Sequence, residues 1–261
     1  SAVPFHMWTP DAYEGAPTLV AGFMSTGVKA AAFAAFARVF LSALQPLHEV
    51  WAPALWVVAV ATMVVGTLVG VAQTNVKRML AYSSIAHAGY LIVGIIAANG
   101  VGKAGILFYL AAYAVTNLGA FGIIALLSTE DRPYEELKDF NGLWQARPGL
   151  AALMTVFLLS LGGLPPTAGF VAKWYVFAAA VQEGYYWLAI IGVLTSVISV
   201  VYYLRVVVNM YMVEHRGDRV LPSMPAAAAA GLAIALVGVF YMGILPSIFI
   251  DAAARSIETI F

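Results

Sequence analysis

Two lysines lie deep inside apolar stretches of this sequence, where a charged side chain is unfavourable. Lys29 lies near the middle of a predicted helix at residues 17–38, and Lys173 lies within an apolar run at residues 149–181. At about 1.5 Å of rise per residue, the Lys29 ammonium group would have to reach about 14–18 Å along its helix to meet water. A lysine side chain is shorter than that, so we expect Lys29 to face protein or a hydrated cavity.

An ionisable side chain at membrane depth is a candidate for ion or proton transfer unless a structural partner neutralises it. Burial disfavours the cationic form of a lysine and a nearby carboxylate favours it. A lysine held between the two influences can exchange a proton near neutral pH. No Asp or Glu lies within any predicted span. We therefore expect a partner acid for Lys29, if there is one, to come from another part of the protein or from another chain.

His87 and Asn117 are the two residues that offer a polar link between the lysines. The His87 imidazole titrates near neutrality and could relay a proton, although a hydrogen-bonded packing role is equally compatible with its position. Asn117 lies in the middle of another predicted helix, where it could order water or bond a neighbouring helix. We expect Lys77 and Arg78 to be interfacial anchors, and Arg205 to extend toward the polar end of its helix.

The segment at residues 160–175, S-L-G-G-L-P-P-T-A-G-F-V-A-K-W-Y, interrupts the run that contains Lys173. A straight helix over residues 149–181 would measure roughly 50 Å, against about 30 Å of hydrocarbon. Pro165 and Pro166 lack backbone donors, and neighbouring glycines allow an unwound turn. Freed backbone groups are tolerated at this depth only where protein or a water-filled cavity satisfies them. We predict a helix interrupted between Gly162 and Gly169, deep in the bundle, as at ion sites of transporters.

The composition is that of a polytopic helical membrane protein. Hydrophobic residues make up 62% of the sequence and charged residues 10%, and the mean hydropathy is +0.90. The net charge of zero gives no indication of a nucleic-acid partner. Without cysteine there are no disulfides, thiolate zinc sites or cysteine-ligated clusters. The four histidines show no metal-ligand spacing, and no dinucleotide fingerprint follows a strand pattern. We expect any redox chemistry to belong to another subunit.

The apolar runs predict an all-α membrane protein with about seven transmembrane helices and the end of an eighth. The spans are predicted at residues 17–38, 53–71, 80–98, 104–127, 149–181, 185–212 and 226–245. We expect residues 1–261 to form one transmembrane domain with four parts. Residues 1–16 are the end of a broken helix and an interfacial loop, and residues 17–52 are a lysine-bearing helix and a polar loop with His48 and Glu49. Residues 53–212 are a five-helix repeat, and residues 213–261 are a C-terminal helix and a weakly amphipathic tail.

Lysine and arginine are distributed unevenly between alternate loops. One side collects Lys77, Arg78, Arg132, Lys138, Arg147, Arg216 and Arg219, and the other collects Arg38, Lys103 and Arg255. Cytoplasmic loops carry an excess of these residues. The first side is therefore expected to be cytoplasmic and the C-terminus to lie on the other side.

Three motifs, taken in their order along the chain, resemble those of a known family. They are V-P-F-H-M-W-T-P-D-A-Y-E-G-A-P-T at residues 3–18, Q-T-N-V-K-R-M-L-A-Y-S-S-I-A-H-A-G-Y at residues 73–90, and the 160–175 segment quoted above. Together they resemble the antiporter-like membrane subunits of NADH-quinone oxidoreductase, respiratory complex I. Related chains occur in multisubunit cation/proton antiporters and membrane-bound hydrogenases. The Asn of the second motif and the short P-P-T-A-G-F stretch favour a complex I subunit among them.

The resemblance implies a position for each lysine. The family has fourteen helices with two inverted five-helix repeats, each containing one broken helix. On that template the chain runs from the end of helix 7 through helix 14, with the N-terminal half absent. Lys29 would be the central helix-8 lysine and Lys173 the lysine of broken helix 12. A glutamate partner and a further lysine would precede Ser1.

The resemblance also implies a function. We expect a non-redox subunit of a proton-translocating enzyme in the bacterial inner membrane, in contact with other membrane subunits and the lipid bilayer. NADH, FMN, iron–sulfur clusters and quinone would belong to other subunits. A proton would be held on Lys29, pass through His87 or Asn117, and be released through Lys173. The alternatives are a subunit of a multisubunit Na⁺/H⁺ antiporter and a passive membrane scaffold. Neither the type of quinone nor the choice of H⁺ over Na⁺ follows from the sequence.

Overall fold

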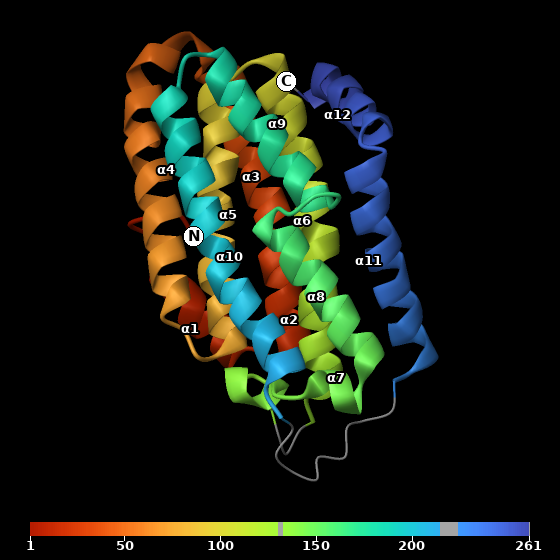
Figure 1. Ribbon diagram of the computed structural model, residues 1–261. Coiled ribbons are helices and arrows are strands. Elements are labelled where there is room, and N and C mark those ends of the chain that lie inside the picture. Colours follow the sequence, from red (N-terminus) through yellow and green to blue (C-terminus); the bar gives the residue numbers. More distant parts are fainter. Residues whose placement is uncertain (130–132, 215–223, 261) are drawn as a thin grey trace.

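The computed structural model describes residues 1–129, 133–214 and 224–260, and this part of the chain is a bundle of helices (Figure 1). Six rods in it are long and apolar enough to cross a membrane: Thr18–Ala43, Gln45–Val71, Val76–Ala97, Gly100–Leu127, Tyr186–Met212 and Ala226–Ile244. A further crossing is made by two shorter helices, α8 (Pro148–Gly162) and α9 (Ala168–Gln182). The predicted all-α membrane architecture, with one broken helix, is confirmed.

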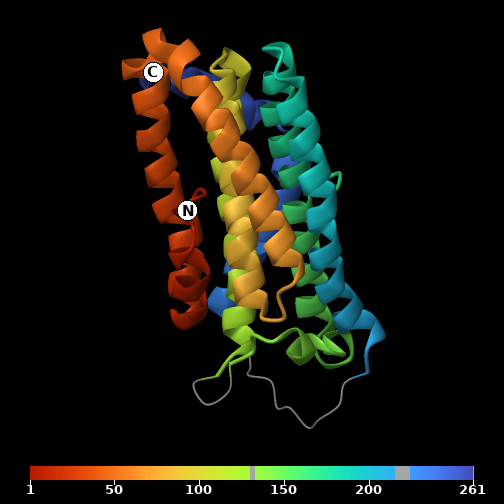
Figure 2. The same ribbon diagram turned by 90° about the vertical axis from the view of Figure 1, so that its left-hand side faces the viewer.

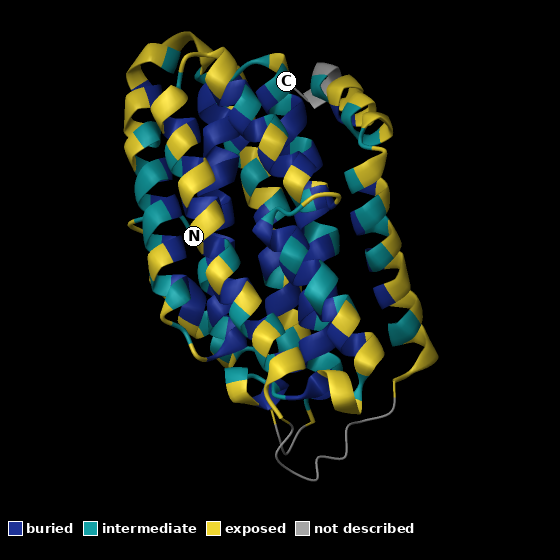
Figure 3. Cartoon of the chain, viewed as in Figure 1, coloured by how far each residue is buried: buried dark blue, intermediate teal, exposed yellow. Residues whose placement is uncertain are grey.

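Helix α5 (Val76–Ala97) is the centre of the bundle, and nearly all of its residues are buried (Figure 3). It packs against α4 (His48–Val71), α6 (Gly100–Leu127) and α9. Two glycines let α4 and α5 approach closely. A Cβ at Gly66 would lie 2.6 Å from the Ala86 nitrogen, and a Cβ at Gly89 would lie 3.0 Å from the Met63 nitrogen. Small residues at such crossings bring helix backbones into contact within a membrane.

The first long rod lies at one edge of the bundle, as Figure 2 shows, and carries Lys29. It consists of α2 (Thr18–Phe23), a π-helical turn (Met24–Val28), α3 (Lys29–Arg38) and a second π-helical turn (Val39–Ala43). Lys29 directly follows the first π turn. Such turns interrupt the regular helical register and are frequent at functional sites.

Residues 8–15 lie within the segment 1–16 that was expected to contain the end of a broken helix and an interfacial loop. They form α1 (Trp8–Gly15), in whose first turn Pro10 is tolerated and Asp11 is favourable. The expected polar loop around His48 and Glu49 is wrong, since α4 already begins at His48. A hydrogen bond of 2.9 Å between His48 Nε2 and the Ile96 carbonyl holds this helix start.

Four described residues of the predicted basic side lie at the same end of the bundle. Lys77, Arg78, Lys138 and Arg147 lie at the end that carries the short helix α7 (Leu143–Ala146), whereas the C-terminal helix α12 (Ser247–Ile260) lies at the other end (Figure 1). Arg132, Arg216 and Arg219, which contributed to the predicted charge asymmetry, lie outside the described residues, as does His215.

Candidate functional site

The break predicted in the fifth span is present between α8 and α9. Gly163 adopts φ +84°, in the left-handed region that favours glycine. The Thr167 hydroxyl donates to the Leu164 carbonyl at 2.7 Å within the unwound segment. Gly169 is required by a close approach, because the Ser160 carbonyl occupies the place that a Cβ would take. The chain thus leaves α8 and enters α9 without a continuous ladder of backbone hydrogen bonds.

Lys173 points back into this break and is only 5% exposed. Its Nζ donates to the carbonyls of Leu161 and Gly162 at 2.8 and 2.9 Å and to the Ser196 hydroxyl at 2.7 Å. The two carbonyls belong to the last turn of α8, where backbone acceptors have no partner inside the helix. A cation is also favoured there by the partial negative charge of a helix C-terminus. Lys173 therefore caps α8 from the helix that follows it.

Lys29 is held in a similar way by neutral groups. It is 6% exposed, and its Nζ donates to the Ser84 carbonyl at 2.5 Å and to the Ser84 hydroxyl. The Tyr113 ring centroid lies 4.9 Å from Nζ, in the range of a cation–π contact. Neither Lys29 nor Lys173 forms an ion pair within the described part of the chain, in which salt bridges involve Lys77 and Arg78.

His87 contacts both of the tyrosines that lie beside the two lysines, Tyr113 at Lys29 and Tyr90 at Lys173. Its ring centroid is 4.9 Å from that of Tyr113 and 5.5 Å from that of Tyr90, and Lys173 Nζ lies 5.3 Å from the Tyr90 centroid. His87 Nδ1 is 2.6 Å from the Tyr109 hydroxyl. We call the set Lys29, Ser84, Tyr113, His87, Tyr109, Tyr90, Lys173 and Ser196 the lysine–histidine line.

Asn117 forms its hydrogen bond with a residue outside the lysine–histidine line. Its Nδ2 donates to the Ser25 hydroxyl at 2.5 Å, which ties α6 to the π turn before Lys29. Its Oδ1 is buried and has no hydrogen-bond partner among the described residues. This geometry supports a role for Asn117 in hydrogen bonding a neighbouring helix. Its role as a proton relay stays a prediction.

Sequence reasoning missed the tyrosines and serines of the line. Ser84, His87 and Tyr90 recur every third residue in S-S-I-A-H-A-G-Y, a spacing that places them on one helix face, so this part was accessible from the pattern. Tyr113 and Ser196 come from other helices, and no local pattern in the sequence connects them with the lysines.

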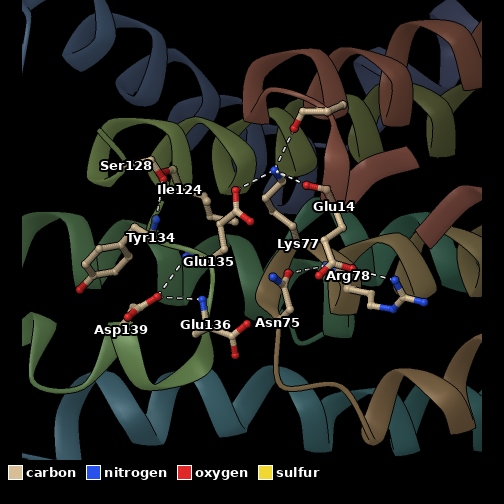
Figure 4. Close-up of polar contacts among 11 residues, drawn as sticks. Glu14, Asn75, Lys77, Arg78, Ile124, Ser128, Tyr134, Glu135, Glu136 and Asp139 are labelled. Atoms are coloured by element: carbon tan, nitrogen blue, oxygen red, sulfur yellow. Dashed lines mark hydrogen bonds and ion pairs between the residues drawn. The ribbon is translucent and has the colours of Figure 1, made fainter. Parts of the chain in front are cut away.

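Lys77 is not the interfacial anchor that the sequence predicted. It is 2% exposed, and its Nζ lies 2.7 Å from Glu135 Oε1 (Figure 4). The same group donates to the carbonyls of Glu14 and Ala16 at 3.0 and 2.9 Å. Acceptors in the loop after α6, at the end of α1 and in the α1–α2 connection allow this cation to be buried. The cluster fastens three segments at one end of the bundle.

Arg78 and Arg205 remain nearer to the surface. Arg78 Nη1 pairs with Glu14 at 2.7 Å (Figure 4) and with Asp11 at 2.6 Å, and its side chain is 30% exposed. Arg205 Nη1 donates to the Val71 carbonyl at 2.5 Å and caps the C-terminal end of α4. Among the described residues, no group of three His, Cys, Asp or Glu side chains could hold a metal ion.

The sequence matches a protein-family profile and several curated relatives. The sequence profile described as "NADH:quinone oxidoreductase/Mrp antiporter, TM" matches residues 1–199. The chain is 48% identical over 260 residues to NADH-quinone oxidoreductase subunit N of Trichlorobacter lovleyi, covering 100% of this chain and 53% of that protein. It is 49% identical to subunit N 2 of Roseiflexus castenholzii, covering 97% and 52%. The chain thus spans about half the length of the curated relatives it matches.

Solved structures show the same arrangement of helices. A chain of respiratory complex I from Thermus thermophilus, solved with bound aureothin, superposes with a TM-score of 0.84 at 36% identity, over 97% of this chain and 55% of that one. A chain of the Mrp complex from Dietzia sp. DQ12-45-1b superposes with a TM-score of 0.87 at 21% identity, over 99% and 56%. The second similarity concerns the fold alone.

Proposed function

Because this chain belongs to the NADH:quinone oxidoreductase/Mrp antiporter family of transmembrane proteins, we propose that it is part of a proton-translocating membrane subunit of NADH-quinone oxidoreductase. Its identity of 48% to subunit N of Trichlorobacter lovleyi favours this assignment over a subunit of a multisubunit Na⁺/H⁺ antiporter. Redox energy released elsewhere in the complex would drive protons through this subunit.

The observation that carries the proposal is the series of hydrogen-bond, cation–π and aromatic ring contacts from Lys29 through His87 to Lys173. Both lysines are buried and are held by carbonyls, hydroxyls and aromatic rings instead of carboxylates. Two cations cannot both remain charged in a low-dielectric interior without a large electrostatic cost. Protonation of one lysine therefore lowers the proton affinity of the other, and a single proton can be shared between them.

The residues of the line divide the transfer into short steps. Lys29 becomes a neutral amine as its proton passes toward His87, which lies one helical turn from Ser84. An ordered water can bridge two polar groups that lie too far apart for a direct hydrogen bond, at little energetic cost. His87 accepts the proton on one ring nitrogen and releases it from the other. The neutral amine of Lys173 then receives it beside the end of α8, where the carbonyls of Leu161 and Gly162 stabilise the cation that forms.

The partners follow from the same assignment. We assign NADH, FMN, iron–sulfur clusters and quinone to other subunits of the complex and no cofactor to this chain. The remainder of the subunit would supply an acidic partner and a further lysine. The exposed apolar residues Leu19, Phe23 and Val28 on the Lys29-bearing rod fit a surface that this remainder, neighbouring membrane subunits or lipid would cover.

The orientation in the membrane is also part of the proposal. The end of the bundle with Lys77, Arg78, Lys138 and Arg147 would face the cytoplasm of a bacterium, in its inner membrane. The C-terminal helix α12 would then lie on the non-cytoplasmic side.

The proposal is tested by replacing each lysine in the assembled complex. Lys29→Ala and Lys173→Ala should each lower the number of protons moved per electron in proteoliposomes, with assembly largely retained. Lys103→Ala, at a helix start away from the line, serves as the control. Normal proton movement in both lysine variants would leave only the scaffold function.

A further inference from the structure

Two consecutive residues of α10 (Tyr186–Met212) act on the Lys173 site in different ways. Ser196 accepts a hydrogen bond of 2.7 Å from Lys173 Nζ and belongs to the lysine–histidine line. The hydroxyl of Thr195 accepts a hydrogen bond of 3.4 Å from the Tyr90 hydroxyl. Thr195 and Tyr90 are both buried. Because the Tyr90 ring lies beside Lys173, Thr195 is linked to the same cation through Tyr90.

The Thr195 hydroxyl is held in one orientation by its own helix. It donates to the carbonyls of Ile191 and Gly192 at 2.9 and 3.0 Å. A threonine hydroxyl has one proton and two acceptor positions, so its proton is committed to the main chain of α10 and an acceptor position is left for Tyr90. The branched side chain is also stiff about its first torsion angle. Thr195 therefore offers the Tyr90 hydroxyl a fixed acceptor.

The position of the Tyr90 ring determines its contacts with two titratable groups. Its centroid lies 5.3 Å from Lys173 Nζ and 5.5 Å from the centroid of the His87 ring. A cation is attracted to an aromatic face only within about 6 Å of the centroid. The hydroxyl is at the far end of the ring from the main chain, so its bond to Thr195 fixes the end that would otherwise be free to move. The ring face is thereby kept within reach of Lys173.

The same helix supports the Tyr90 ring through a second aromatic residue. The ring of Phe177 on α9 packs against that of Tyr90 with the centroids 5.6 Å apart and the planes at 90°. Gly192, one turn before Thr195, leaves the space for Phe177, since a Cβ at Gly192 would lie 2.4 Å from a carbon of the Phe177 ring. Helix α10 thus fixes Tyr90 directly at its hydroxyl and indirectly at its ring.

We propose that Thr195 is a positioning residue for proton transfer, which holds the Tyr90 ring against Lys173 by accepting the Tyr90 hydroxyl. The inference rests on the proposed function and assigns to Thr195 a role that does not involve carrying a proton, because its own proton stays bonded to the main chain of α10. The ring that it holds in place stabilises the protonated form of Lys173.

A competing acceptor makes this role necessary. The Thr67 hydroxyl of α4 also lies near the hydroxyl of Tyr90. It is buried and makes no hydrogen bond of good geometry to a described residue. A buried hydroxyl without an acceptor is unfavourable, so loss of the Thr195 hydroxyl would turn Tyr90 toward Thr67 and move its ring relative to Lys173.

The experiment measures protons moved per electron by the assembled complex in proteoliposomes. Thr195→Val keeps the shape of the side chain without its hydroxyl, and its ratio should fall between those of the wild type and Lys173→Ala. Thr195→Ser keeps the hydroxyl and should restore the wild-type ratio. Tyr90→Phe removes the other half of the bond and should match Thr195→Val. Thr62→Val is the matched control, because Thr62 is buried and bonds a carbonyl of its own helix at 2.6 Å, and its ratio should equal that of the wild type.

The double variant Thr195→Val with Tyr90→Phe should have the ratio of either single variant, because both changes break one bond. A further fall in the double variant, a wild-type ratio in Thr195→Val, or equal losses in Thr195→Val and Thr195→Ser would overturn the positioning role and leave the proposed function standing. Wild-type ratios in both Lys29→Ala and Lys173→Ala would overturn the proposed function itself. If Thr195→Val does not assemble, Thr195→Ala removes the same hydroxyl from a smaller side chain, and its ratio beside that of Thr195→Ser decides.

Discussion

Ser84 and Tyr90 lie three residues to either side of His87 on α5, and each contacts a different buried lysine, Ser84 binding Lys29 and the Tyr90 ring lying beside Lys173. Residues three apart occupy one face of a helix, so a single face of the most buried helix serves both cations. The two lysine sites are built from the same kinds of group. Lys29 has one main-chain carbonyl and Lys173 has two, and each lysine also has one serine hydroxyl and one tyrosine ring. A cation held by neutral groups can lose its proton without leaving a buried anion unpaired.

Replacement of Lys29 by arginine separates charge from proton exchange. Arginine keeps a cation in place but does not release its proton. We expect Lys29→Arg to assemble and to move fewer protons per electron, measured in proteoliposomes, with Arg38→Lys on the same rod as the control. A normal ratio in Lys29→Arg would mean that only the charge at this position matters.

His87 and Asn117 can be distinguished as relay residues. His87→Phe keeps an aromatic ring against Tyr109 and Tyr113 but has no nitrogen to carry a proton, so proton movement should fall to the level of Lys173→Ala. Asn117→Ala should lower the melting temperature of the complex, because it removes a buried bond to Ser25, and should leave the proton ratio unchanged. A lowered proton ratio in Asn117→Ala together with a normal ratio in His87→Phe would assign the relay to Asn117.

The ion pair of Lys77 and Glu135 should support stability and not transport. Glu135→Gln leaves a buried cation without its carboxylate, a loss on the order of 3 kcal/mol for such pairs. Asp11→Asn breaks a far more exposed pair with Arg78 and should cost less than about 1 kcal/mol. Thermal unfolding of the purified complex measures both effects. The double variant Lys77→Met with Glu135→Gln should recover part of the loss, and a further loss instead would contradict this reading.

Two glycines of α11 (Ala226–Ile244) give opposite predictions. A Cβ at Gly243 would collide with the Pro166 carbonyl in the break, whereas a Cβ at Gly231 would meet open space. Gly243→Ala should push α11 away from the break and destabilise the complex by about 1–3 kcal/mol. Gly231→Ala should be neutral or stabilising by up to about 1 kcal/mol through helix propensity. The melting temperatures of the complexes that contain Gly243→Ala and Gly231→Ala are compared. Equal values would show that close packing of α11 against the break does not contribute to stability.

The identity of the transported ion can be tested without mutation. Sodium ions are held by oxygen ligands, and carboxylates are the strongest of these for hard cations. In the described part of the chain, the hydrogen-bond partners of Lys29, His87 and Lys173 include no carboxylate. Proton movement should therefore be the same in Na⁺-free potassium buffer as in sodium buffer at equal ionic strength. A requirement for Na⁺ would favour the antiporter alternative.

Several features of this protein follow from local sequence alone. The break at residues 163–167 was predictable because adjacent prolines and glycines determine backbone geometry wherever they occur in a helix. The membrane spans were predictable because their number and approximate limits depend on runs of apolar residues. The burial of Lys29 followed from its distance to the nearest helix ends. Each of these properties is a function of residues that are neighbours in the chain.

Tertiary structure decided what the buried cations bind. Ser84 is 55 positions from Lys29, and Ser196 is 23 positions from Lys173, so no pattern within one helix could reveal either contact. The same applies to Lys77, whose burial depends on Glu135 in a loop 58 positions away. A buried charge is tolerated only where acceptors converge on it. Hydropathy gives the depth of a lysine in the membrane, but the packing of helices determines which oxygen atoms and rings surround it.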